Sequence, residues 1–79
     1  MEKFILSTGT ELSDYSAVMI AEGVEKAECM EDLLLAWSYI GKKMLYMHLQ
    51  GFFGRTLRSL YEQGFFDENF NIIHEALEA

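Results

Sequence analysis

Apolar residues recur at helical spacing along most of this chain, and none of its 79 residues is a proline that would interrupt a helix. Ser13 suits the N-cap of a first helix, and Gly23 is placed to end it. A second helix follows, with an apolar stripe of Met30, Leu33, Leu34, Trp37 and Ile40. Glu25 and Glu28 are expected near the positive end of this second helix. Both segments therefore predict helices.

The second helix should end near residue 41, because the apolar faces before and after this residue do not line up. At about 100° per residue, the later face lies roughly a third of a turn from the earlier one. This later face consists of Leu45, Leu49, Phe52, Phe53, Thr56 and Leu60. Gly41 therefore predicts a helix end, with two helices meeting near residues 41–44, and one bent helix is the alternative. The third helix should end at Gln63, with Gly64 as a left-handed cap.

The two ends of the chain carry shorter patterns. Asp67 is placed to cap a last helix. Its buried positions are expected to be Phe70, Ile73 and Leu77, with Ile72 at the edge. Residues 1–12 hold one apolar triplet beside Ser, Thr and Gly, which indicates a tail or a short strand. We expect an all-α fold, a compact bundle of about four short helices, with residues 13–79 as a single helical domain.

The chain is short for a protein with one core. A chain of this length buries only about 60% of the surface that it exposes when unfolded. Disulfides cannot help, since Cys29 is the only cysteine, and no Cys/His cluster predicts a metal site. Apolar residues make up 51% of the chain, more than so short a chain easily buries. We therefore expect a homo-oligomer.

The net charge of -7 is unevenly distributed. Acids dominate residues 1–32 and 64–79, whereas residues 33–63 hold four of the six basic residues and a single acid. General nucleic-acid binding is not expected with this charge. No membrane contact is expected either, because the longest apolar run, residues 33–37, is far shorter than the ~20 residues that span a bilayer. The single thiol and the short apolar run after Lys3 favour the cytoplasm.

The expected third helix carries the residues best suited to binding. The candidate binding site consists of Gln50, Gly51, Gly54, Arg55 and Arg58. Each glycine inside a helix costs about 1 kcal/mol relative to alanine, so some benefit should offset it. Glycines three apart let a ligand or a backbone approach closely, and two arginines one turn apart can hold a carboxylate or phosphate. The alternative is that the glycines serve helix packing and that Arg58 pairs with Glu62 at the surface.

Three short runs between Met19 and Phe66 are similar to a sequence pattern that other proteins share. They read Trp-Ser-Tyr at residues 37–39, Leu-Gln-Gly-Phe-Phe-Gly-Arg-Thr at 49–56 and Glu-Gln-Gly at 62–64. In these runs the chain resembles a family of small uncharacterised bacteriophage proteins, whose shared run is approximately L-Q-G-x-[YF]-G-R-[TM]-A. It departs from the family pattern at Lys43-Met44, where Thr-Gly is usual, and at Leu57, where alanine is usual. The resemblance implies a phage origin more strongly than an activity.

No pattern of catalytic residues supports an enzyme. His48 and His74 form no metal-binding pair, and no nucleophile or phosphate-loop motif occurs, so neither a metal nor a cofactor is expected. The leading hypothesis is a phage accessory protein that interferes with a host process, such as antiviral defence. It would do so by stoichiometric binding of a host protein in the host cytoplasm, with its acidic ends facing a basic surface. The alternatives are an oligomer that sequesters a small anionic ligand, such as a signalling nucleotide, and a structural or assembly factor.

Overall fold

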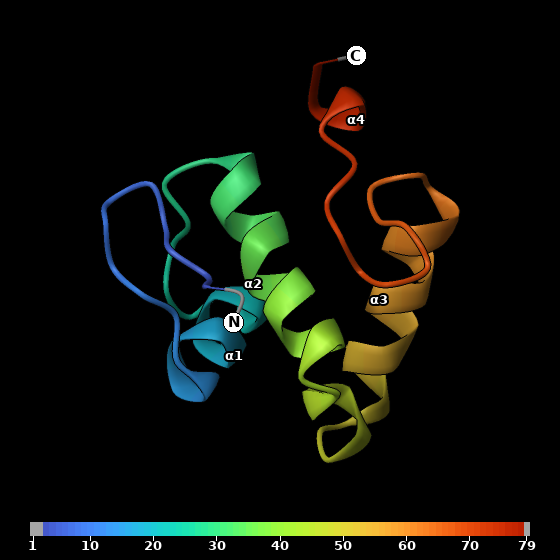
Figure 1. Cartoon of the computed structure of the whole chain (residues 1–79). Helices are drawn as coiled ribbons and strands as arrows, with labels where there is room; N and C mark the ends of the chain where they lie inside the picture. Colours follow the sequence, from blue (N-terminus) through green and yellow to red (C-terminus); the bar gives the residue numbers. More distant parts are fainter. Residues whose placement is uncertain (1–2, 79) are drawn as a thin grey trace.

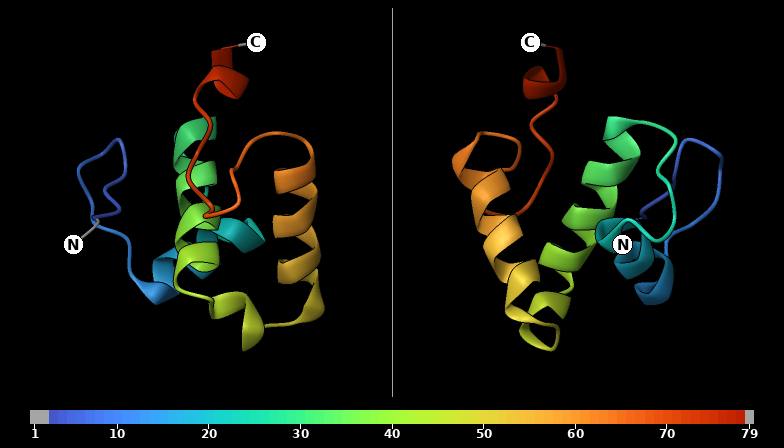
Figure 2. Two further views of the ribbon diagram at one scale, coloured as in Figure 1. Left: turned by 45° about the vertical axis from the view of Figure 1, so that its right-hand side comes forward. Right: turned by 180° about the vertical axis from the view of Figure 1, so that it is seen from behind.

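Helix α2 (Met30–Lys42) occupies the centre of the computed structural model, which describes residues 3–78 (Figure 1). The amino-terminal segment and α1 lie on one side of α2, and α3 lies on the other (Figures 1 and 2). The remaining elements are α1 (Asp14–Glu22), the 3₁₀ helix η1 (Leu45–Met47), α3 (Gly51–Glu62) and the single-turn α4 (Glu75–Glu78). Residues 3–78 contain no strand, only isolated antiparallel bridges between Ile5 and Glu11 and between Phe66 and Ile72. The expected all-α fold is confirmed.

Helix α1 begins and ends where the sequence predicts. The Ser13 hydroxyl accepts a hydrogen bond from the backbone amide of Ser16 (3.2 Å), and the Ser16 hydroxyl accepts one from the amide of Ser13 (2.8 Å). These two bonds form a capping box, which satisfies amides that have no partner within the helix. Gly23 ends the helix in the left-handed conformation, with φ at 82°. Helix α1 packs on α2, and its buried residues are Ala17 and Ile20.

Helix α2 begins later than predicted. It starts at Met30, so Glu25 and Glu28 precede it and do not lie in its first turn. The backbone amides of Val24 and Glu25 both donate to the carbonyl of Met19 (3.0 and 3.2 Å). These bonds belong to the carboxyl end of α1, so this stretch closes one helix and cannot open the next.

The predicted break between the second and third helices is confirmed, and it begins within the predicted residues 41–44. Helix α2 continues through Gly41 to Lys42, and the chain then turns at Met44, which has a left-handed φ of 57°. The 3₁₀ helix η1 follows, and α3 begins only at Gly51. The prediction that Gly41 ends the helix is wrong. Its backbone lies instead against the ring of Phe70, where any larger residue would collide.

The buried faces of α2 and α3 also differ from the predicted stripes. Met30 is 55% exposed, although the predicted stripe includes it, whereas Tyr39 is buried. Segments pack on α2 from more than one side, so a single stripe does not describe its buried surface. On α3, Phe53 and Leu57 are buried and Phe52 is 43% exposed.

The predicted last helix is wrong for most of its length. Residues 65–74 form turns and extended backbone, and only α4 after them is helical. The Asp67 carboxylate accepts hydrogen bonds from the backbone amides of Asn69 and Asn71 (2.8 and 2.9 Å), so it caps a turn instead of a helix. Phe70 within this turn has a left-handed φ of 63°. The residues expected to be buried are only half-buried: Phe70, Ile73 and Leu77.

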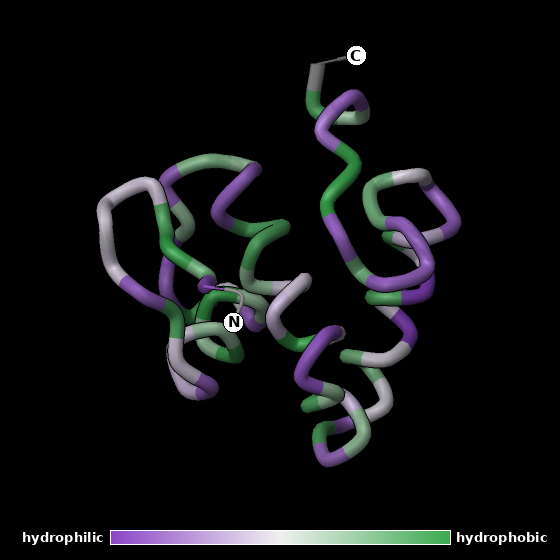
Figure 3. Tube along the Cα trace, viewed as in Figure 1, coloured by the Kyte–Doolittle hydropathy of each residue, from purple (hydrophilic) through white to green (hydrophobic). Residues whose placement is uncertain are grey.

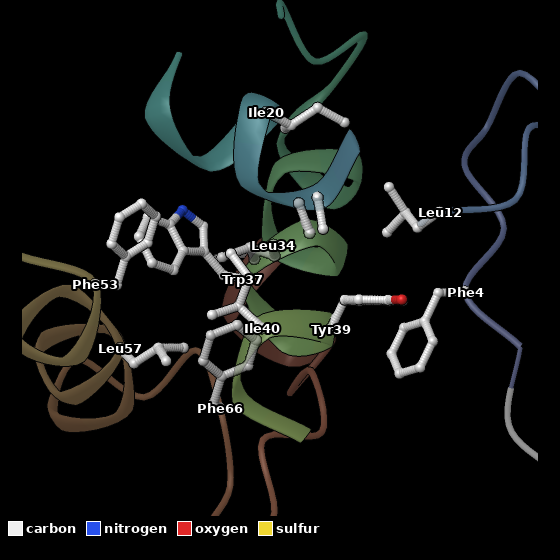
Figure 4. Close-up of a cluster of buried hydrophobic side chains, with 12 residues drawn as sticks. Phe4, Leu12, Ile20, Leu34, Trp37, Tyr39, Ile40, Phe53, Leu57 and Phe66 are labelled. Atoms are coloured by element: carbon white, nitrogen blue, oxygen red, sulfur yellow. The ribbon is translucent and has the colours of Figure 1, made fainter. Parts of the chain in front are cut away.

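One hydrophobic core joins both ends of the described chain to the helices (Figure 4). From the amino-terminal segment, the ring of Phe4 meets Tyr39 of α2 edge-on, with 5.0 Å between centroids. On the other side of the core, Trp37 of α2 lies 5.8 Å from Phe53 of α3. Phe66, which is 1% exposed, brings the carboxyl-terminal segment into the same core. The two ends are therefore structural parts of the helical fold.

No helix in residues 3–78 is long and apolar enough to cross a membrane. Figure 3 shows that hydrophilic and hydrophobic stretches alternate along the chain.

Candidate binding site on helix α3

A pocket of about 440 Å³ lies on one side of α3, and we call it the α3 pocket. Three segments of the chain form it: η1, α3 and the carboxyl-terminal segment that runs back beside α2 (Figures 1 and 2). Its lining residues are Tyr46, Gly54, Leu57, Arg58, Tyr61, Glu68 and Phe70. The volume falls in the range of pockets that hold a small ligand or a side chain of a partner.

Helix geometry brings the α3 residues of the pocket together. Gly54, Arg58 and Tyr61 are spaced by four and three residues, so they share one side of the helix. Leu57 lies beneath them and is 2% exposed. Gly54 has no side chain, so the pocket extends to the helix backbone at this position. Only the ring of Tyr46 lies near a Cβ added there, at 3.9 Å, among the described residues.

Besides Tyr61, the pocket has two aromatic walls, Tyr46 and Phe70, and turns of the backbone position both. Tyr46 belongs to η1, which begins after the left-handed residue Met44. Phe70 is held by the turn that Asp67 organises, and its ring centroid lies 6.2 Å from that of Tyr46 at an angle of 51°. The hydrogen bonds that the Asp67 carboxylate accepts, first from the backbone of Asn71, lower its pKa below the ordinary 3.8. The turn beside the pocket is therefore formed around a carboxylate.

The pocket contains charges of both signs. Arg58 lies on the α3 side and Glu68 on the side of the carboxyl-terminal segment. Arg58 Nε is 3.9 Å from Glu62 Oε1, and the two side chains are 81% and 63% exposed. An ion pair so long and so exposed contributes little to stability. The Arg58 side chain can therefore leave Glu62 for a ligand at small cost.

The structure divides the candidate residues predicted from the sequence into two groups. Gly54 and Arg58 line the α3 pocket. Gln50 is the N-cap residue of α3, Gly51 is its exposed first residue, and neither lines the pocket. Arg55 lies outside it as well. Its guanidinium group lies along its own helix, with Nη1 2.9 Å from where a Cβ of Gly51 would be.

Close helix packing does not account for either glycine. Among the described residues, the atoms within 4 Å of an added Cβ are those of Arg55 for Gly51 and of Tyr46 for Gly54. No described atom of another α-helix lies that near. Gly51 also occupies the first position of α3 and not its interior, where a glycine is most costly. The interior glycine is Gly54, and the space that a side chain would occupy there is part of the pocket.

Sequence reasoning missed five residues of the pocket: Tyr46, Leu57, Tyr61, Glu68 and Phe70. Tyr61 could have been predicted from the sequence, because it follows Gly54 by seven residues on the predicted helix and so lies on the same side. Tyr46 and Phe70 gave no such signal. The turns that position them depend on left-handed residues other than glycine.

The cysteine and the two histidines considered in the sequence analysis do not line the α3 pocket. Cys29, His48 and His74 are all exposed, and His74 Nδ1 lies 3.9 Å from Glu31 Oε2. Within the described part of the chain, no group of three or more His, Cys, Asp or Glu side chains is placed to hold a metal ion.

No family model matches the sequence, and neither a curated protein nor a solved structure shows significant similarity to it.

Proposed function

We propose that this protein acts without catalysis, by stoichiometric binding of a partner protein at the α3 pocket. The composition of the pocket supports this proposal: Arg58 and Tyr61 are exposed at a concave site with aromatic walls. Arginine and tyrosine are enriched among the residues that dominate protein–protein binding energies. The apolar floor at Leu57 favours a side chain of a partner that has an apolar body.

The charges of the pocket also favour a protein over a small anion. Arg58 can attract an acidic group, but Glu68 lines the same pocket and repels it. A protein surface offers both signs of charge within a few ångströms and can satisfy both residues together. A small anionic ligand would have to accept the repulsion by Glu68.

The proposed partner is a host protein in the host cytoplasm, and the protein would then be a phage accessory protein that interferes with a host process such as antiviral defence. The resemblance at residues 49–56 supports the phage origin. The net charge of -7 favours a partner with a basic surface around the contact, because opposite charge accelerates association.

Quantitative capture from host lysate tests the proposal. Tagged native protein is compared with Tyr61→Ala and Arg58→Ala, and the proteins retained by each are measured by mass spectrometry. Tyr15→Ala is the matched control, since Tyr15 is 69% exposed on α1, away from the pocket. We expect one host protein to be retained by the native chain and the control, and at least about tenfold less by the pocket variants. Equal retention by all four proteins would contradict the proposal.

Two further measurements, with Arg55→Ala as an additional variant, separate the proposal from its two alternatives. If the protein sequesters a small anionic ligand, calorimetry with a panel of cyclic nucleotides should show binding that Arg58→Ala or Arg55→Ala removes. If the protein is a structural or assembly factor, light scattering should show a large defined assembly that retains no host protein. Capture of a host protein together with no binding in calorimetry supports the proposed function over both.

A further inference from the structure

A second pocket, of about 350 Å³, lies where the amino-terminal segment, α2 and the carboxyl-terminal segment meet. None of the described residues that line it also lines the α3 pocket. We call it the terminal-segment pocket, because residues close to both ends of the chain contribute to it. Three basic side chains line it: Lys3, Lys42 and His74.

This grouping of basic residues contrasts with the charge of the whole protein. The chain has six Lys and Arg residues and a net charge of -7, yet two of those six line this one pocket together with one of the two histidines. Glu31 is the acid that lines the pocket, and it lies 3.9 Å from His74. Among the described residues that line the pocket, basic side chains therefore outnumber acidic ones, which favours anions.

The position of Lys42 is constrained by its surroundings. Its ammonium group lies over the ring of Phe4, 5.6 Å from the centroid, which is a cation–π contact. Since Phe4 is a buried core residue, this contact holds the lysine stem against the fold. Lys3 and His74 are exposed and can turn toward a ligand.

The remaining lining residues are three apolar side chains and the polar residues Ser38 and Asn71. Ile5, Leu35 and Ile72 each come from a different one of the three segments. The Ser38 hydroxyl also lines the pocket, but it donates its hydrogen to the carbonyl of Phe70 (2.6 Å) and cannot donate it to a ligand. Binding there would therefore combine cationic contacts for one end of a ligand with apolar contacts for its body.

We propose that the terminal-segment pocket binds a small organic anion, in which a carboxylate or a phosphate is attached to a compact apolar group. The exposed basic side chains Lys3 and His74 hold the anionic group, and the isoleucine and leucine side chains contact the apolar body. This site does not depend on the proposed function of the α3 pocket, because the two pockets have no described lining residue in common.

An NMR titration of the full-length protein tests this inference, with phenyl phosphate and benzoate as probes and benzyl alcohol as the neutral analogue. We expect saturable chemical-shift changes in residues 3–5, 35–42 and 71–74 with at least one anion, and none with the alcohol. If benzoate and phenyl phosphate differ in affinity, the tighter probe identifies the anionic group that the pocket prefers.

Charge variants show whether the anion binds at this pocket. Lys3→Gln combined with His74→Gln changes two exposed side chains, so the fold should persist, and we expect affinity to fall by about tenfold. Lys26→Gln removes an exposed charge outside the pocket and should change affinity less than about twofold. Three results would overturn the inference: no saturable shifts with either anion, equal binding of the alcohol, or an equal loss in the Lys26 variant.

Discussion

The ring of Phe70 lies directly against the backbone of Gly41 in the last turns of α2. A Cβ added to Gly41 would be 2.6 Å from Cγ of Phe70 and 2.7 Å from its Cδ1. The contact fixes the carboxyl-terminal segment to the central helix, and the same ring forms one wall of the α3 pocket. Gly41 therefore supports the pocket, although it does not line it.

Replacement of this glycine should destabilise the fold. In Gly41→Ala the methyl group can be accommodated only if Phe70 moves, because the ring is in the way. We expect the free energy of unfolding to fall by about 1–3 kcal/mol, as for other substitutions that overpack a core. Urea unfolding monitored by circular dichroism measures the change. An unchanged stability would mean that Phe70 does not pack against α2 in solution.

Gly54→Ala should have the opposite effect on stability. The added methyl group meets only the ring of Tyr46, at an ordinary contact distance of 3.9 Å, and alanine favours a helix by about 1 kcal/mol over glycine. We therefore expect a more stable protein with a smaller α3 pocket and weaker capture of its partner. The same unfolding experiment and the same lysate capture provide the two measurements. Undiminished capture by this variant would show that the partner does not occupy the pocket at Gly54.

The Asp32 carboxylate should be needed to hold the amino-terminal segment. Asp32 is 4% exposed, and its two oxygens accept hydrogen bonds from the Ser7 backbone amide (2.9 Å) and the Ser7 hydroxyl (2.6 Å). Asp32→Ala leaves the Ser7 donors without this acceptor, so we expect a loss of about 1–3 kcal/mol. Urea unfolding gives the loss, and Glu31→Ala, at the exposed neighbouring acid, is the control. Equal losses in both variants would contradict the specific role of Asp32.

Tyr39 should make the fold sensitive to high pH. Burial raises the pKa of Tyr39 to about 12 from 10.0, and the hydrogen bond that its hydroxyl donates to Asp14 acts in the same direction. The folded state thus holds this proton more tightly than the unfolded state. The resulting stability is fully present below pH 10 and is lost as the pH rises toward 12. Urea unfolding across that range should show a smaller decline in Tyr39→Phe, and equal declines in the two proteins would contradict the assignment.

Self-association remains a prediction from the short core and the apolar composition. The exposed apolar side chains include Val24 (64%), Met30 (55%) and Phe52 (43%), which are available for contacts between copies. Sedimentation at micromolar concentration should give a mass above that of the single 9.1 kDa chain. A single-chain mass together with cooperative unfolding would contradict this expectation, whereas the proposed binding at the α3 pocket does not depend on it.

Local sequence determined the parts of the fold that local interactions hold in place. The ends of α1 follow from Ser13 and Gly23, because a side-chain cap and a left-handed glycine act within a few residues of the helix end. The break before the third helix follows from two apolar faces that point in different directions. The candidate residues Gly54 and Arg58 follow from their spacing to Gly51 and Arg55 on one predicted helix.

Only the tertiary structure decided the position of α2 in the middle of the fold and the path of the carboxyl-terminal segment. Asp67 looks like a helix cap in the sequence, but the segment after it forms a turn in which Phe66 and Phe70 pack on distant residues. Helical periodicity describes one face of one element, whereas a pocket depends on how separate elements meet. The α3 pocket therefore depends on the tertiary structure, which places Tyr46 and Phe70, 24 residues apart in the sequence, beside the same side of α3.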